Sequence, residues 1–149
     1  MSKRTKQHKL GMLQHFPAVR RFQVLHIDIF GPLPPSRGFK YVLGANCRFT
    51  RYVELTCLRT MEAEKVAESF FNSIICRHGA VEEIHCDRGT QFRSALFRRL
   101  AEVCGIGGVS GSGIRYNTPY NPKGNGRIEV ANKTIGRFMK MISDEEGSN

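Results

Sequence analysis

The chain has 149 residues, of which 40% are apolar and 24% charged, values that suit one globular domain with its own core. No apolar run approaches the roughly 20 residues that a membrane span requires, and residues 1–10 are basic instead of forming a hydrophobic signal region. We therefore expect an intracellular protein without a membrane partner. The net charge of +10 favours a polyanionic partner, most commonly nucleic acid. Five scattered cysteines without a C-x-x-C pair indicate neither a disulfide framework nor a four-ligand zinc pattern.

Three strands are expected in the first part of the chain. Residues 1–21 are predicted to be a basic, poorly ordered leader, and apolar residues then alternate from Phe22 to Ile29, which is typical of a strand. The proline-rich residues 31–35 end this strand because proline cannot donate to a ladder. Further strands at about 39–46 and 50–57 lie close enough in sequence to form antiparallel hairpins.

Two helices and a strand are expected next. The first helix begins at a Thr60 cap and ends at Gly79. Its expected apolar stripe consists of Val66, Ala67, Phe70, Phe71, Ile74 and Ile75. A strand at 81–86 leads to Asp87, and the second helix runs from a Ser94 cap to Gly105. Its expected inward residues are Leu96, Phe97, Leu100 and Val103.

The last part of the chain combines glycine-rich, turn-rich and helical segments. Residues 105–113 are flexible by composition, a brief strand is expected at 114–116, and residues 117–124 are rich in turn formers. The final helix is predicted at about 125–142, and residues 143–149 form a polar tail. The order βββαβαβα predicts a five-stranded mixed sheet with helices on both faces, whose site lies where the carboxyl ends of strands diverge.

Three acidic residues are candidates for a metal site. Asp28 lies on the first strand, Asp87 ends the fourth strand, and Glu129 begins the final helix. If the two strands are parallel neighbours, both aspartates reach the same rim, where mutual repulsion favours Mg²⁺ or Mn²⁺. Two such ions can activate a water or hydroxyl for attack on a phosphodiester. From spacing alone, a surface pair of Glu129 with Lys133 and a turn cap by Asp87 remain the favoured alternatives.

Two histidines precede the aspartates by two positions. Alternation along a strand places His26 on the face of Asp28 and His85 on the face of Asp87. A mixed histidine–carboxylate metal centre is one interpretation. A packed role for each histidine is the favoured one.

Three ordered motifs indicate a family. Residues 26–34 (HIDIFGPLP), 86–92 (CDRGTQF) and 119–129 (PYNPKGNGRIE) closely resemble the integrase core of Ty3/gypsy-type retrotransposons and retroviruses, with similarity over about residues 22–142. The resemblance implies an α/β, RNase H-like fold and a D,D-x-E site that binds metal and catalyses. It assigns Asp28, Asp87 and Glu129 to that site. The implied activity is a polynucleotidyl transferase that performs 3′-end processing and strand transfer on DNA, in the nucleus or in retroelement particles.

Eight further residues are candidate DNA contacts. Two polar residues follow the second aspartate, three occupy the loop before the final helix, and three basic residues share the helix face of Glu129. They are Thr90, Gln91, Tyr120, Asn121, Lys123, Lys133, Arg137 and Lys140. A finished turn and solvated lysines are the alternative interpretations.

The match to the family has departures. The interval between Asp87 and Glu129 holds 41 residues (129 − 87 − 1), longer than is usual in the family, and the excess falls in residues 105–113. Cys47 stands where members of the family often have an aspartate, and Asn121 stands where they often have a histidine. We expect the zinc module, the later core helices and the C-terminal DNA-binding domain to be absent, which weakens a possible homodimer. A catalytically inactive nucleic-acid-binding remnant and an RNase H-like nuclease are therefore alternatives.

Overall fold

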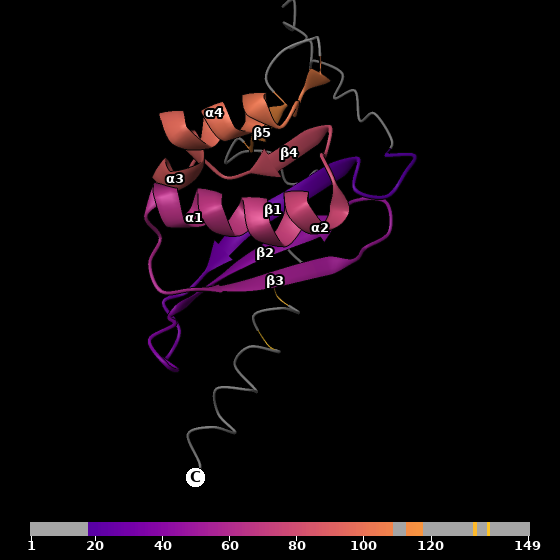
Figure 1. The fold of residues 1–149 in the computed structure, drawn as a ribbon. Helices are drawn as coiled ribbons and strands as arrows, with labels where there is room; N and C mark the ends of the chain where they lie inside the picture. The colour runs from indigo at the N-terminus through magenta and orange to yellow at the C-terminus, as the bar shows by residue number, and fades with distance from the viewer. Residues whose placement is uncertain (1–17, 109–112, 118–132, 134–136, 138–149) are drawn as a thin grey trace, which may run out of the picture.

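The computed structural model describes residues 18–108, 113–117, 133 and 137. The described strands form one mixed sheet in the order β3-β2-β1-β4-β5 (Figure 1). Their bounds are β1 Val24–Phe30, β2 Tyr41–Cys47, β3 Val53–Leu58, β4 Glu83–Cys86 and β5 Ile114–Tyr116. The first three strands pair antiparallel, whereas β1 with β4 and β4 with β5 pair parallel. The predicted hairpins and crossovers are confirmed.

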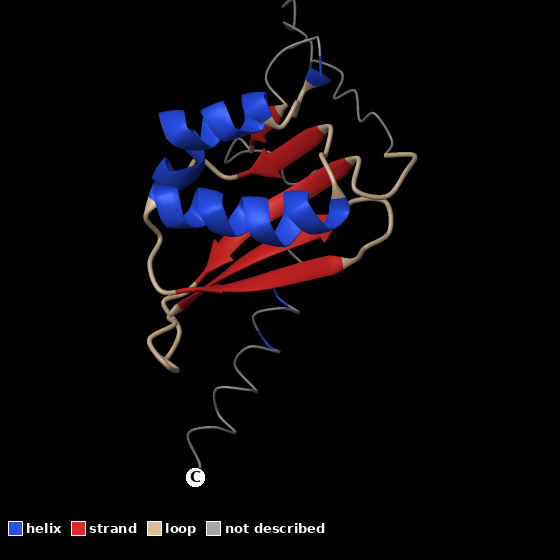
Figure 2. Ribbon diagram, viewed as in Figure 1, coloured by secondary structure: helices blue, strands red, loops and turns tan. Residues whose placement is uncertain are grey.

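The described helices cover one face of the sheet, as Figure 2 shows. They are α1 Ala63–Phe70, the π-helix η1 Phe71–Ile75, α2 Cys76–His78, α3 Thr90–Arg93 and α4 Ala95–Val103. The helix expected for the other face lies at about 125–142, largely outside the described residues. Within that range the structure describes Lys133 and Arg137, and both have helical backbone.

The first long helix begins later than its sequence suggested. Thr60 Oγ1 accepts a hydrogen bond from the Glu62 N–H at 3.3 Å, but the helix N-cap is Glu62, which makes no side-chain cap. The predicted Thr60 cap is therefore wrong, because Thr60 stabilises the turn before the helix. Gly79 ends the helical segment at φ 84° as predicted. Phe71 is 39% exposed, since a side chain adjacent to the buried Phe70 points about 100° away from it.

The α4 helix is capped as expected but buries a different stripe. The Phe97 N–H donates to Ser94 Oγ at 3.1 Å, which confirms the N-cap. Phe97 is buried with Ala101 four residues later, whereas Leu96 is 48% and Val103 71% exposed. The inward placement of Leu96 and Val103 was wrong, because the helix turns Phe97, Ala101 and the partly buried Leu100 toward the core instead.

The end of α4 is an ordered Schellman cap. Gly105, at φ 70°, donates to the Glu102 carbonyl at 3.0 Å, and Ile106 donates to the Ala101 carbonyl at 2.9 Å. Ile106 is buried, and Gly107 donates to the Glu82 carbonyl at 2.9 Å. The expectation of flexibility is therefore wrong for residues 105–108, while residues 109–112 lie outside the described chain.

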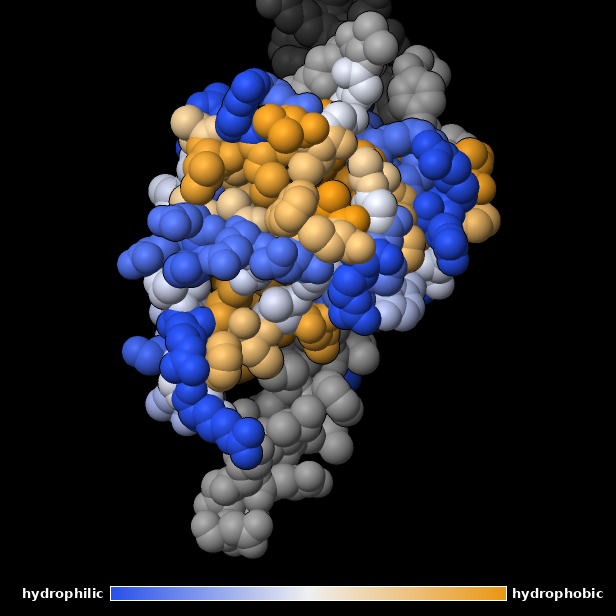
Figure 3. All heavy atoms as spheres, viewed as in Figure 1, coloured by the Kyte–Doolittle hydropathy of each residue, from blue (hydrophilic) through white to orange (hydrophobic). Residues whose placement is uncertain are grey.

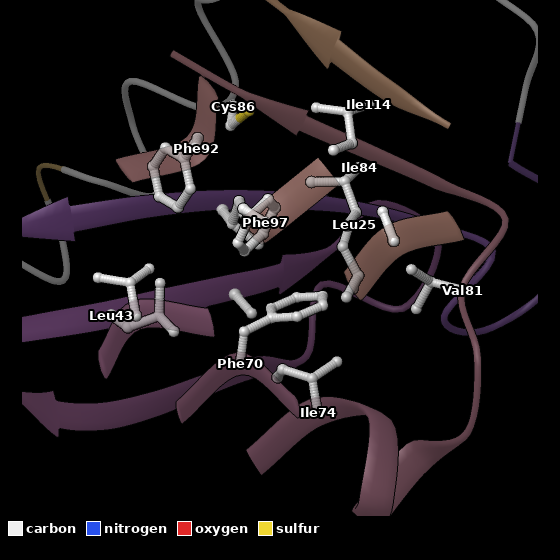
Figure 4. Packing of buried hydrophobic residues seen from close by; sticks show 14 of the residues in the cluster. Leu25, Leu43, Phe70, Ile74, Val81, Ile84, Cys86, Phe92, Phe97 and Ile114 are labelled. Atoms are coloured by element: carbon white, nitrogen blue, oxygen red, sulfur yellow. The ribbon is translucent and has the colours of Figure 1, made fainter. Parts of the chain in front are cut away.

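The core lies between the sheet and these helices (Figure 4). Its centre holds Phe70 and Phe92, whose rings each lie 5.5 Å from the Phe97 ring, centroid to centroid. Phe92 belongs to α3, a short helix that sequence periodicity did not indicate. Because Phe92 is fully buried, it anchors the segment that follows Asp87.

Candidate active site

The pairing of β1 with β4 brings two aspartates that are far apart in the sequence to the same level of the sheet. Residues that differ by 59 positions are partners along these parallel strands, as in Leu25 with Ile84 and His26 with His85. Continuing this register by two residues places Asp28 opposite Asp87, since 87 − 28 = 59. Leu25 and Ile84 point into the core, so alternation places both aspartates toward the other face of the sheet.

Asp28 is half-buried beside a like charge. Burial raises the pKa of this carboxyl, and the charge of Asp87 raises it further, against the opposing effect of the Ile29 N–H. That N–H donates to Asp28 Oδ1 at 2.9 Å. Burial and the charges of Asp87 and Asp28 also raise the pKa of Cys86 to about 12. The Asp28–Asp87 rim therefore concentrates negative charge, and a cation there would relieve it.

A tight turn orients Asp87. The Gly89 N–H donates to Asp87 Oδ1 at 2.7 Å. A Cβ on Gly89 would meet Gln91 Nε2 at 2.5 Å and Asp87 Oδ1 at 2.8 Å. The present orientation of Asp87 therefore requires the space that glycine leaves, because a side chain at position 89 would displace the ends of the Asp87 and Gln91 side chains. This requirement is a functional feature that our sequence analysis missed, although the CDRGTQF motif contains the residue.

Aromatic residues hold the two aspartate-bearing segments in place. The Tyr116 hydroxyl donates to the Phe92 carbonyl at 3.0 Å, which ties β5 to α3. Phe30, two residues after Asp28, lays its ring over Gly44, where a Cβ would meet it at 2.9 Å. Gly44 is the β2 partner of Asp28, so this ring covers the backbone beside the carboxylate. Phe30, Phe92 and Tyr116 were not predicted as supports of the site.

The two histidines, each two residues before its aspartate, pack against one another. The rings of His26 and His85 meet edge-to-face with centroids 4.8 Å apart. His85 Nε2 contacts Glu83 Oε1, which also accepts from Arg115 Nε at 2.8 Å. Burial, with the charges of His85 and nearby arginines, lowers the pKa of His26 to about 3. His26 is therefore neutral, and both rings have the packed role that was favoured from sequence.

The structure describes four of the other candidate residues, Thr90, Gln91, Lys133 and Arg137. Thr90 and Gln91 form the first turn of α3 directly after the Asp87 turn, with Thr90 exposed. Lys133 and Arg137 are exposed. The remaining candidates lie outside the described residues: Glu129, Tyr120, Asn121, Lys123 and Lys140. The structure thus brings together two of the three predicted carboxylates.

The donor chemistry of the rim suits a hard divalent cation. Carboxylate oxygens are the ligands that Mg²⁺ and Mn²⁺ prefer, and the like-charged pair has its own electrostatic need for a cation. Among the described residues, no group of three histidine, cysteine or acidic side chains is arranged to hold a metal. A complete site therefore requires a further ligand, for which Glu129 is the sequence candidate.

Comparison with known proteins identifies the family. Residues 18–117, more than half of the chain, match the model of the family described as integrase core domain. The chain is 30% identical over 124 residues to the Pro-Pol polyprotein of simian foamy virus type 3, covering 83% of this chain and 10% of that one. It is 25% identical over 142 residues to the transposon Tf2-3 polyprotein of Schizosaccharomyces pombe, covering 93% and 10%. The chain thus spans about a tenth of the length of these relatives.

Solved structures agree on the fold. The catalytic core domain of BIV integrase superposes with a TM-score of 0.59 at 22% identity, covering 75% of this chain and 65% of that one. That similarity, together with the observed sheet order, confirms the RNase H-like fold expected from sequence. The chain belongs to the integrase core domain family of retroviruses and retrotransposons.

Proposed function

We propose that this chain is the core of an integrase-type polynucleotidyl transferase, which performs 3′-end processing and strand transfer on DNA phosphodiesters with two divalent metals. The observation that carries the proposal is the parallel register of β1 and β4, which, extended by two residues, sets Asp28 level with Asp87 directly after β4, where the charge of Asp87 acts on Asp28. Family membership supports the same reaction class. The fold supplies what this chemistry needs, which is fixed carboxylates at a strand rim.

Each aspartate has a distinct role in the proposed site. Asp28, on a central strand, contributes a half-buried carboxylate whose raised pKa reflects the cost of holding its charge beside Asp87. Asp87 is oriented through the Gly89 N–H at one oxygen. With Glu129 as the third ligand, these residues would hold Mg²⁺ or Mn²⁺, which supplies activation of the attacking oxygen and stabilisation of the leaving one.

DNA is the proposed partner at this rim. The chain carries a net charge of +10, and the exposed Thr90 begins α3 directly after the Asp87 turn. We propose Thr90 and Gln91 as contacts to the DNA near the metals. The predicted loop and helix contacts, from Tyr120 to Lys140, belong to the same proposal. The expected place of action is the nucleus or a retroelement particle, where such DNA would be found.

Self-association is a further part of the proposal. Figure 3 shows apolar side chains gathered on the face formed by α1 and α4. Exposed Leu96, Val103 and Phe71 belong to these helices and to η1. A homodimer through this face would bury them. Sedimentation of the chain against a Leu96→Asp variant would measure it, and an unchanged monomeric value for both proteins would contradict it.

A disintegration-type assay tests the chemistry without requiring flanking domains. The 149-residue chain should rejoin a branched DNA substrate in Mg²⁺ or Mn²⁺, and Asp28→Asn should lower the rate by more than about a hundredfold, because loss of even an outer-shell partner typically costs 10- to 100-fold. Glu68→Gln is the matched control, since Glu68 sits in an exposed pair with Lys65 on α1. Its rate should equal that of the parent.

The outcomes separate the alternative functions. Metal-dependent cleavage without joining would favour an RNase H-like nuclease. DNA binding with neither cleavage nor joining would favour a catalytically inactive remnant. Thermal unfolding in EDTA must show Asp28→Asn to be at least as stable as the parent chain, so that a lost rate reports on chemistry and not on folding.

A further inference from the structure

The link between β1 and β2 is an ordered hairpin, which we call the basic hairpin (residues 31–40). The Leu33 N–H donates to the Lys40 carbonyl at 2.7 Å near its base. At its tip, Ser36 and Phe39 exchange backbone hydrogen bonds of 3.1 and 2.8 Å. The two turn residues, Arg37 and Gly38, have φ of 49° and 84°. Positive φ at both positions is the type I′ pattern, which gives a tight hairpin.

The hairpin holds an arginine from a neighbouring strand end. The guanidinium carbon of Arg59 lies 4.5 Å from the centroid of the Phe39 ring, in cation–π geometry. A Cβ on Gly38 would collide with Arg59 Nη1. Gly38 is therefore required both for its backbone angle and for the room it leaves to this guanidinium. Arg59 is preorganised at the hairpin tip, beside the exposed Arg37.

The cations of this surface form no ion pair with a carboxylate of the described residues. Residues 31–40 include no acidic residue. Within the described part of the chain, no carboxylate forms an ion pair with Arg37, Lys40 or Arg59. Five other described cations each pair with a glutamate: Arg20, Lys65, Arg77, Arg99 and Arg115. Five more arginines within residues 18–108 form no ion pair with a described carboxylate either, but they do not share one hairpin: Arg21, Arg51, Arg88, Arg93 and Arg98. Planar guanidinium groups without a carboxylate suit phosphate oxygens as ligands.

The hairpin lies at the end of the sheet that carries the proposed active site. It begins three residues after Asp28 and projects beyond the end of β1, at the lower left of Figure 1, where Figure 3 shows strongly hydrophilic side chains. The seven backbone steps from Phe30 to Arg37 span at most roughly 25 Å. A DNA major groove is about 12 Å wide. A groove width lies within this limit, so a contact of the tip with a phosphate next to DNA bound at Asp28 is geometrically allowed.

We propose that the basic hairpin is a phosphate-contact site for duplex DNA, in which Arg37 and Arg59 bind backbone phosphates away from the reacting bond. The inference rests on the proposed function for the identity of the nucleic acid. Such contacts position a duplex without reading its sequence. Affinity at this site should therefore depend on salt and be insensitive to base composition.

Two charge-removing variants test the hairpin in the whole 149-residue chain. Arg37→Asn removes the cation and creates Asn-Gly, a preferred type I′ pair, so the turn should persist. Arg59→Gln removes the second cation. Each should weaken binding to a random-sequence 30-base-pair DNA roughly fivefold at 0.15 M salt and reduce the log–log salt slope by about 0.9. Fluorescence anisotropy over a salt series, in EDTA, measures both quantities.

Arg99→Gln is the matched control, because Arg99 is an exposed arginine on α4 that pairs with Glu102 at 3.0 Å. Its salt slope should equal that of the parent chain. Equal losses for Arg99→Gln and the hairpin variants would overturn the proposal, since the effect would then be bulk charge. A larger loss for an RNA duplex or a single strand than for duplex DNA would overturn it as well.

The binding result is independent of the proposed chemistry. Asp28→Asn should retain the full hairpin effect in EDTA, because no metal or reaction is involved. If the disintegration assay fails while Arg37→Asn still lowers the salt slope, the hairpin site stands and the catalytic proposal falls. If the chain is active and Arg37→Asn binds DNA as the parent does, the hairpin site falls alone.

Discussion

Two carboxylates on the same sheet have opposite electrostatic surroundings. Glu54 on β3 is 9% exposed, and burial alone would raise its pKa. Hydrogen bonds from His78 and Tyr52 and the charge of Arg77 outweigh burial, so its pKa is lowered. Burial and the charge of Asp87 raise the pKa of Asp28 on β1, against the opposing hydrogen bond from the Ile29 N–H.

The difference separates a structural carboxylate, Glu54, from Asp28, which we propose as a metal ligand. His78 Nε2 lies 2.9 Å from Glu54 Oε2, and the Tyr52 hydroxyl donates to the same oxygen at 3.3 Å. Phe22 stacks on the His78 ring with centroids 4.1 Å apart. Every partner of Glu54 is supplied by the chain, so this cluster stabilises the fold. Asp28 instead lies beside the like charge of Asp87, which together with burial raises its pKa, a perturbation that is common at functional sites.

The largest effect on stability is expected for Glu54, the carboxylate whose partners lower its pKa. Glu54→Gln should lower the free energy of unfolding by about 2 kcal/mol, because it removes the charge and replaces one of the two oxygens that accept from Arg77, His78 and Tyr52 with an amide donor. Glu68→Gln, in the exposed pair with Lys65, should change it by less than about 0.5 kcal/mol. Urea denaturation of both variants measures the difference. Equal losses would show that the Glu54 cluster is not a stabilising one.

Divalent metal should stabilise the chain by binding at Asp28 and Asp87. At a Mg²⁺ concentration tenfold above its Kd, the parent should gain about 1.4 kcal/mol in unfolding free energy. Asp28→Asn should lose this gain while being no less stable than the parent in EDTA, because the like-charge repulsion with Asp87 disappears. Thermal unfolding with and without Mg²⁺ provides the measurement. A metal gain that survives Asp28→Asn would place the binding site elsewhere.

Alanine substitutions of two glycines should separate an effect on the geometry of the metal site from an effect of backbone strain on stability. Gly89→Ala introduces a Cβ against Gln91 and Asp87, so metal-dependent stabilisation should fall while the apo chain changes little. Gly79→Ala meets open space but has φ 84°, so it should cost about 1 kcal/mol and leave the metal effect intact. Mg²⁺ titrations monitored by thermal unfolding test both variants. The comparison fails if the two substitutions affect metal binding equally.

The smallest expected effect is on the pH dependence of stability, to which Glu54 and Asp28 should contribute with opposite signs. A lowered pKa means that Glu54 contributes stability above its ordinary value of 4.5, which is lost as pH falls through the folded pKa. A raised pKa means that Asp28 contributes stability below its ordinary value of 3.8, which is lost as pH rises through the folded pKa. Acid destabilisation should therefore be shallower in Glu54→Gln and steeper in Asp28→Asn. Denaturation series between pH 3 and 7 would reveal a reversed order, which would contradict both assignments.

Sequence patterns predicted the elements that depend on local rules. Alternating apolar residues located β1, turn residues separated the hairpins, and Ser94 marked the start of α4. The exposure of Leu96, Val103 and Phe71 was not predicted correctly. Periodicity shows that a helix has an apolar side, but the side that is buried depends on the surface against which the helix packs.

For the candidate site too, the sequence predicted which residues take part, whereas their arrangement in space depended on the fold. The sequence by itself determined the identity and order of Asp28 and Asp87 and the motifs around them, because short-range backbone preferences and residue types are local properties. Only the tertiary structure decided that residues 59 positions apart share a register, that Gly89 admits the Asp87 carboxylate, and that Phe39 holds Arg59. These features depend on strand pairing and side-chain contacts between distant segments, and the charge state of a carboxylate depends on such neighbours.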